Sequence, residues 1–158
     1  MSPKNKPLAV IPDANVIISL CAREKGTYPT AKTAVDDYIK KGYEFFAPEV
    51  IVSEVIFVLC HKLTAGELTQ STHEKAIETL KDYMSFISAA PNGEASLIDR
   101  SIEIRSGYGC SRSSDGLYIA LAEEMSSAYE IEILTFDKGM INQTAKNAPT
   151  VTINLLPI

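Results

Sequence analysis

The sequence has few cysteines, and their spacing suits no zinc site. The three cysteines, Cys21, Cys60 and Cys110, are widely separated and form no CxxC pair. An odd number of isolated thiols is typical of reduced cysteines in a cytosolic protein. We therefore expect a cytoplasmic protein without structural zinc.

The sequence also lacks a long uncharged apolar segment. Its two most apolar stretches are interrupted by Asp13 and by Glu54, so neither reaches the ~20 residues that a membrane-spanning helix needs. The first residues carry positive charge, but they lack the apolar core and cleavage site of a secretory signal. We expect no membrane insertion, and we expect residues 1–7 to form a flexible N-terminal extension.

Basic charge is not in excess either. Lys and Arg number 15 against 20 Asp and Glu, which gives a formal net charge of −5 at pH 7. The sequence therefore predicts no basic surface for nucleic acid, although divalent cations can supply positive charge at a phosphate. A glycine-rich phosphate loop and the residue order of a Ser-His-Asp triad are also missing.

The sequence does contain an alternation of short apolar strands and amphipathic helices. Its 158 residues suffice for a sizeable core, and no linker or repeat divides them. The apolar pattern predicts strands at 8–11, 44–47, 95–98, 130–134 and 150–155, and helices at 16–21, 31–41, 48–63, 67–89, 99–105 and 114–125. We therefore predict a single α/β domain over residues 1–158, a three-layer α/β/α sandwich around a short parallel sheet.

Four acids adjoin the apolar segments of this pattern. Asp13 and Asp137 each follow a predicted strand, so both are expected at the edge where the carboxyl ends of parallel strands meet. Asp115 begins a strongly apolar helix. Glu54 lies within a helix, and we expect it on the buried face because its neighbours one turn away are all apolar: Val50, Ile51, Phe57 and Val58.

Each of these acids has a simpler explanation. Asp13 and Asp115 can cap or open a helix, and Asp137 can belong to a plain turn. Glu54 has no capping role in mid-helix, so its alternative is an ion pair with a core Arg or Lys. As a cluster, however, four carboxylates repel one another and need cations or protons. An all-oxygen set without His or Cys selects hard ions, Mg²⁺ or Mn²⁺.

In their order and context, these residues resemble the PIN-domain nucleases. The resemblance runs from about Leu8 to Leu156. It rests on Asp13-x-Asn15 after the first strand, Glu54 in the helix after Pro48, Ser114-Asp115-Gly116-Leu117-Tyr118 at a helix start, and Thr135-x-Asp137 after a strand. One departure is Gly116, where the family usually has Ala.

The resemblance implies a parallel α/β/α sandwich that cleaves RNA with Mg²⁺ or Mn²⁺. Many bacterial members are VapC-like toxins restrained by an antitoxin. The implied catalytic and metal-binding residues are Asp13, Glu54, Asp115 and Asp137, and the supporting residues are Asn15, Ser114 and Thr135. Three cations near these motifs are predicted to contact the phosphate backbone, with solvated surface charge as the alternative: Arg23, Arg112 and Lys138.

We therefore predict a Mg²⁺- or Mn²⁺-dependent endoribonuclease that cleaves RNA with metal-activated water. An antitoxin protein is an implied partner, and we expect a homodimer through apolar surface at 57–59 and on the helix at 67–89. One alternative is a non-catalytic RNA- or protein-binding module of the same fold. Another is a metal-dependent phosphatase, which would want a second Asp where this chain has Asn15.

Overall fold

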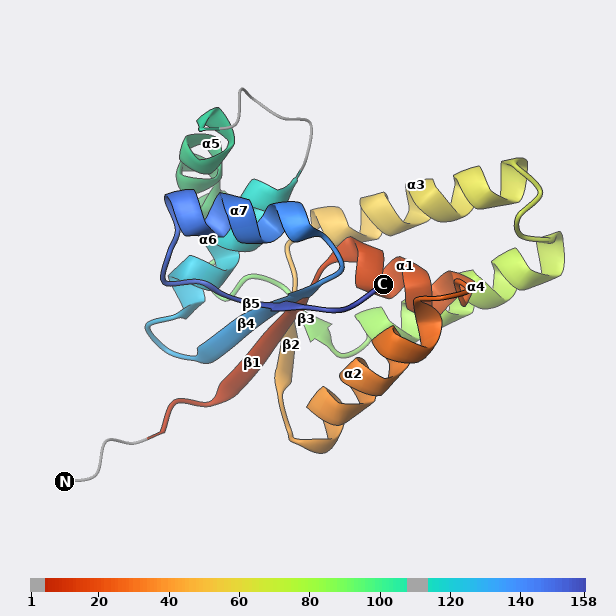
Figure 1. Cartoon of the computed structure of the whole chain (residues 1–158), viewed down its shortest axis with the longest axis horizontal. Helices are drawn as coiled ribbons and strands as arrows, with labels where there is room; N and C mark the ends of the chain where they lie inside the picture. The colour runs from red at the N-terminus through yellow and green to blue at the C-terminus, as the bar shows by residue number, and fades with distance from the viewer. Residues whose placement is uncertain (1–4, 108–113) are drawn as a thin grey trace.

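A parallel sheet of five strands forms the centre of the protein. The computed structural model describes residues 5–107 and 114–158. The strands lie in the order β3-β2-β1-β4-β5, and every neighbouring pair is parallel (Figure 1). The strands are β1 (Leu8–Pro12), β2 (Glu44–Phe46), β3 (Ile87–Ser88), β4 (Glu130–Thr135) and β5 (Thr152–Leu155).

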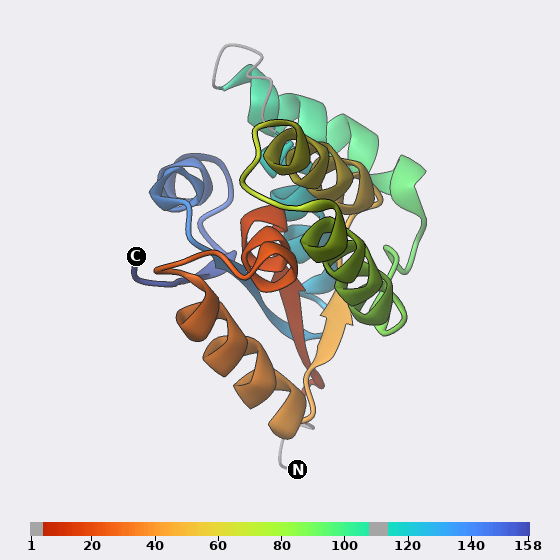
Figure 2. The same ribbon diagram turned by 90° about the vertical axis from the view of Figure 1, so that its right-hand side faces the viewer.

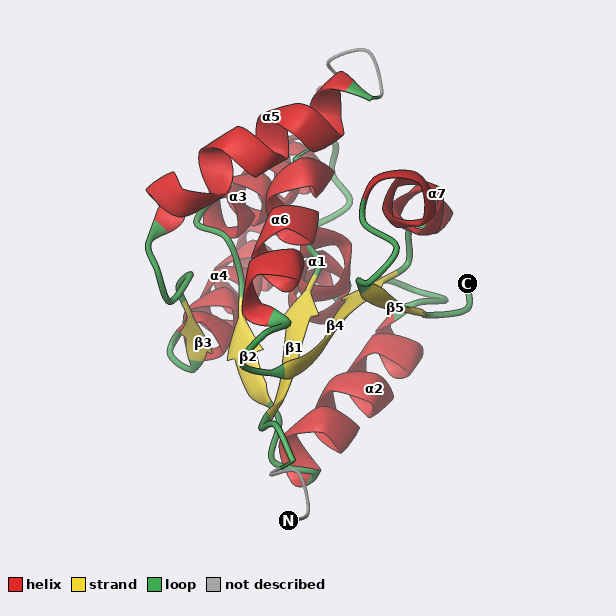
Figure 3. Cartoon of the chain, turned by 90° about the vertical axis from the view of Figure 1, so that its left-hand side faces the viewer, coloured by secondary structure: helices red, strands yellow, loops and turns green. Residues whose placement is uncertain are grey.

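Helices cover both faces of this sheet. One group, α1 to α4, gathers on one face, as Figure 2 shows from that side. Seen from the opposite side in Figure 3, α5 and α6 cover the other face and α7 lies beside β5. The helices are α1 (Ala14–Ala22), α2 (Tyr28–Lys40), α3 (Val50–Thr64), α4 (Gln70–Met84), α5 (Ile98–Ser106), α6 (Asp115–Met125) and α7 (Lys138–Asn147). The predicted α/β/α sandwich with a parallel sheet is confirmed.

The core follows from the central position of β1. Ala9, Val10 and Ile11 are fully buried, because the strand has a paired neighbour on each side and helices on both faces. Val16 and Ile17, from the helix that follows, belong to the same buried cluster. A polar residue placed between β1 and α1 therefore starts from a buried position.

The ends of β1 and β4 lie side by side. The backbone amide of Asp13 donates to the carbonyl of Leu134 at 2.8 Å, which extends the pairing one residue beyond β1. Helix α1 begins at Ala14 and α7 begins at Lys138, shortly after the end of β4. The two helix N-termini are thereby brought to the same edge of the sheet.

Two predicted elements are wrong. Residues 94–97 form a 3₁₀ helix, η1 (Glu94–Leu97), in place of the predicted strand at 95–98. The predicted helix at 67–89 ends at Met84, and Ile87 belongs to β3, where it pairs with Phe45. The spacing of the apolar residues suits a helix through Ile87, but the sheet edge buries this side chain as well.

One helix was not predicted, and the start of another differs from the prediction. The sequence does not predict α7, because among its ten residues only Met140 and Thr144 are buried. Helix α2 begins at Tyr28 and not at residue 31. Pro29 lies in its first turn, where the missing N–H of proline costs no hydrogen bond.

Within the described ranges, no helix is long and apolar enough to cross a membrane. Cys21 is buried and Cys60 is exposed, both as free thiols. Of the N-terminal extension predicted at 1–7, residues 1–4 lie outside the described part of the chain.

Candidate functional site

Asp13 is the most buried acid of the predicted quartet. Its side chain is only 6% exposed, and it caps α1 by accepting a hydrogen bond from the Ala14 amide at 2.7 Å. Burial raises the pKa of this carboxyl from 3.8 to about 7; the charges of Asp115 and Glu54 push it in the same direction, against hydrogen bonds from Thr135 and Ala14. Asp13 is therefore the predicted cap of α1, and its ionised form is also disfavoured by its surroundings.

The Thr135 hydroxyl joins the ends of β1 and β4. It donates to Asp13 Oδ2 at 2.8 Å and accepts from Asn15 Nδ2 at 3.2 Å and from the Asp137 amide at 3.0 Å. A hydroxyl has one donor and two acceptor positions, and this one uses all three. Asn15 completes the connection, because Nδ2 also donates to Asp13 Oδ2 at 3.3 Å and Oδ1 accepts from the Phe136 amide at 3.2 Å.

Glu54 is held by two hydroxyl groups from α6 and the residue before it. Ser114 Oγ donates to Oε2 at 2.8 Å and Tyr118 Oη donates to Oε1 at 2.9 Å. The predicted buried face of α3 is only partly closed, since Glu54 is half-buried and Phe57 is 63% exposed. Ser114 precedes α6 but makes no side-chain capping bond, so its hydroxyl serves Glu54 and not the helix end.

Tyr118 contacts a site acid, although the predicted site did not include it. The side chain is fully buried. Burial and the charge of Glu54 raise the pKa of its hydroxyl, which stays a donor. A signal was present in the sequence: a tyrosine inside an otherwise apolar helix needs a partner for its hydroxyl, and Glu54 was the acid without a local explanation.

Asp115 is the first residue of α6 and is half-buried. Gln143 of α7 donates from Nε2 to Asp115 Oδ2 at 2.6 Å. Gly116 follows directly, and a Cβ there would lie 3.0 Å from the backbone carbonyl oxygen of Ser101 on α5. The departure from alanine at this position thus has a structural reason, since α5 and α6 approach closely.

Asp137 differs from the other three acids. It is exposed and caps α7, with Oδ1 accepting from the Gly139 amide at 2.8 Å. Its backbone is tied to Asp13 through Thr135. The charges of Asp115 and Glu54 are among the main causes of the raised Asp13 pKa, and Asp137 lies beside this group.

The three predicted phosphate contacts have different outcomes. Lys138 is exposed and adjoins Asp137 at the start of α7. Arg23 lies at the opposite end of α1 from Asp13. The helix has nine residues, each of which adds about 1.5 Å to its length, so the two residues are well separated. The Arg23 guanidinium lies 5.7 Å from the centre of the Tyr28 ring. The structure does not bring Arg23 to the acids. Arg112 lies outside the described residues.

The donor chemistry of the acidic group fits a hard divalent cation. Neither Asp13 nor Glu54 forms an ion pair with a cation from residues 5–107 or 114–158, and repulsion among the carboxylates favours a bound positive charge. In the same ranges, however, no three acidic, His or Cys side chains converge closely enough to hold a metal ion. A cation would have to draw these carboxylates together.

Comparison with known proteins identifies the family. The PIN-domain family model matches residues 10–147. The chain belongs to the PIN-domain family. This confirms the resemblance seen in the sequence, and PIN domains as a family are nucleases that typically use divalent metals.

Three solved structures are similar to this chain in fold and distant in sequence. VapBC2 from Rickettsia felis, bound to a DNA fragment from its promoter, has a TM-score of 0.63 and 10% identity, covering 95% of this chain and 100% of that one. FitAcB from Neisseria gonorrhoeae has a TM-score of 0.58 and 16% identity, covering 91% and 95%. PAE2754 from Pyrobaculum aerophilum has a TM-score of 0.54 and 16% identity, covering 92% and 83%. No curated protein matches the sequence.

The Thr135 hydroxyl gives a first prediction for this PIN domain. Thr135→Val keeps the shape of the side chain but removes one of the donors to Asp13, the shortest one to Oδ2. It also removes the acceptor shared by Asn15 Nδ2 and the Asp137 amide. We expect a loss of about 1–3 kcal/mol in the free energy of unfolding by urea titration. Thr135→Ser, which keeps the hydroxyl, is the control. Equal stability of the valine variant and the wild type would contradict this account.

The raised pKa of Asp13 gives a second prediction. Between 3.8 and about 7 the folded state binds more protons than the unfolded chain, so the metal-free protein should lose stability as the pH rises from about 4 to about 7. The expected loss is on the order of 4 kcal/mol. Asp13→Asn should lack this loss in urea titrations across that pH range, whereas the exposed acid Asp99, changed to Asn, should leave it in place. An Asp13→Asn variant whose stability depends on pH in the same way as that of the wild type would refute the assignment.

Proposed function

We propose that this PIN domain is a Mg²⁺- or Mn²⁺-dependent endoribonuclease. The observation that carries the proposal is the buried Asp13 carboxylate at the carboxyl edge of the sheet, with the charges of Asp115 and Glu54 acting on it. A buried acid that two other acids push toward protonation is a site for a cation or for proton transfer. Of these two roles, the family match favours cation binding, because PIN domains are nucleases that typically use divalent metals.

Under this proposal, each acid of the site has its own role. Asp13, Asp115 and Asp137 would hold the cation, which would supply a more acidic bound water and positive charge at the phosphate. Glu54 orients the attacking water, because both of its oxygens are fixed by hydroxyl donors. Lys138 offers positive charge to the RNA backbone at the exposed side of the site.

The two alternatives from the sequence fit less well. A phosphatase of the acid-rich type would use a second Asp at position 15. The Asn15 amide instead forms hydrogen bonds with Asp13, Thr135 and Phe136, so Asn15 connects the ends of β1 and β4. A non-catalytic module would not need to keep Asp13 at a pKa of about 7, which lowers stability at neutral pH.

The nuclease proposal is tested by incubating the chain with a pool of structured RNAs, with and without Mg²⁺ or Mn²⁺. Cleavage should need the metal, and Asp115→Asn should reduce its rate by at least about 100-fold, since the residue acts on the reacting centre. Asp99→Asn is the matched control, because Asp99 is also a first-turn acid of a helix.

Full activity of Asp115→Asn would remove Asp115 from the site. RNA binding without cleavage would favour the binding module, and release of phosphate from small esters would favour the phosphatase.

We further propose that the chain is the toxin of a toxin–antitoxin pair. The support is the fold shared with VapBC2 and FitAcB, together with the proposed ribonuclease activity. Expression in a bacterial host should then stop growth, and Asp13→Asn should restore it at equal protein level. Co-expression of the product of a neighbouring small open reading frame should also restore growth and yield a complex. Normal growth with active wild type would contradict a toxin role.

The homodimer stays a prediction, and only part of the apolar surface expected at 57–59 is exposed. Leu59 is fully buried and cannot contribute, whereas Phe57 is 63% and Ile56 is 47% exposed on α3. Ile98 and Ile102 of α5 are exposed as well.

A further inference from the structure

Gln143 lies in a helix that the sequence did not predict, yet its side chain contacts a predicted site acid. Its Nε2 donates to Asp115 Oδ2 at 2.6 Å, across the gap between α7 and α6. Both side chains are half-buried, which limits competition from water for this hydrogen bond. The contact joins residues that are far apart in the sequence.

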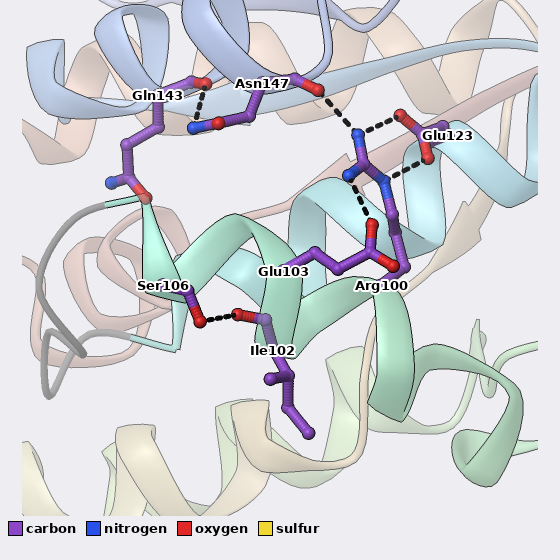
Figure 4. A network of polar contacts seen from close by, with 7 residues as sticks. All are labelled: Arg100, Ile102, Glu103, Ser106, Glu123, Gln143 and Asn147. Carbon is purple, nitrogen blue, oxygen red and sulfur yellow. Dashed lines mark hydrogen bonds and ion pairs between the residues drawn. The ribbon is translucent and has the colours of Figure 1, made fainter.

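The position of Gln143 is set by a polar network at the end of α7. Arg100 of α5 donates to the backbone carbonyl of Asn147 at 2.5 Å. It also donates to both carboxylate oxygens of Glu123 on α6, at 2.6 and 3.1 Å. Asn147 Nδ2 in turn donates to the backbone carbonyl of Gln143 at 3.3 Å. Figure 4 shows this network, with Gln143 and Asn147 one turn apart on α7. Arg100 therefore fixes α7 against the other two helices.

The donor that Gln143 offers to Asp115 is a neutral amide. A Lys or Arg in its place would orient the carboxylate but would also offset the negative charge that a metal ion needs. A neutral donor sets the direction of a ligand and keeps its charge. Glu54 and Asp13 are treated in the same way, by the hydroxyls of Tyr118 and Thr135.

We propose that Gln143 is a positioning residue, which orients the Asp115 carboxylate for a divalent cation through the Nε2–Oδ2 hydrogen bond. This inference rests on the proposed metal-dependent function, and it adds a residue that the acidic quartet does not contain.

The test measures binding of Mn²⁺ alone, followed by the loss of the electron paramagnetic resonance signal of the free ion. Gln143→Met removes the donor at nearly constant size, and it should weaken Mn²⁺ binding about tenfold. Gln143→Asn keeps the amide but shortens the side chain by one methylene, and it should weaken binding in the same direction. Gln70→Met is the matched control, since Gln70 donates to Glu74 at 3.2 Å on exposed α4; it should leave binding unchanged.

Two further measurements separate positioning from general structure. In an Asp115→Asn background, Gln143→Met should have no additional effect on Mn²⁺ binding, because the two residues act as one unit. In RNA cleavage, Gln143→Met should lower kcat about tenfold and leave KM for RNA unchanged.

Unchanged Mn²⁺ binding in both Gln143 variants would overturn the inference. Tighter binding would also overturn it, by showing that the amide stands where the cation belongs, as would an equal effect of Gln70→Met. A wild type that binds Mn²⁺ but cuts no RNA would refute the proposed function, while the Mn²⁺ comparison would still decide the role of Gln143. An active wild type indifferent to Gln143 would refute only the inference.

Discussion

The hydrogen bond from Thr135 to Asp13 is the interaction on which the arrangement of the site depends. Asp13 follows directly on the central strand, where its neighbours are fully buried, so its carboxylate needs donors from the protein itself. The donors come from the start of α1 and from the end of β4. The same hydroxyl also receives the Asp137 amide and the Asn15 side chain. A single buried charge thus fixes where two strands end and where two helices begin.

Three contacts of the described residues share one chemical property, which is the neutrality of the donor. Hydroxyls serve Asp13 and Glu54, and an amide serves Asp115. These groups give direction to the carboxylates without removing charge. The pKa of Asp13 is therefore raised to about 7, first by burial and then by the charges of Asp115 and Glu54. Such an arrangement lowers stability at neutral pH and is retained where a cation or a proton is part of function. On the proposed function, the absent positive charge is the metal.

The sequence predicts the acids better than it predicts what orients them. Asp13 could be placed because a carboxylate after an apolar strand is costly wherever that strand goes, and parallel strands bring their carboxyl ends together. Gln143 could not be placed, because α7 buries only two of its side chains and its apolar pattern is too weak to predict a helix. Ile87 shows the opposite error: its spacing suited a helix, but the edge of the sheet gave it a pairing partner in Phe45. The spacing of apolar residues indicates that a residue is buried, but the tertiary structure determines which element it packs against.

Asp137 can be explained by helix capping alone, without a shared metal site. Its carboxylate is exposed and committed to the Gly139 amide, so capping of α7 accounts for its orientation without a metal. Glu54 lies at the other extreme, in mid-helix and held only by groups from outside α3. A cation at this edge would thus meet the buried carboxylate of Asp13 on its protein side and the exposed carboxylate of Asp137 on its solvent side. On the proposed function, RNA would meet the positive charge of Lys138 on this exposed side of the site.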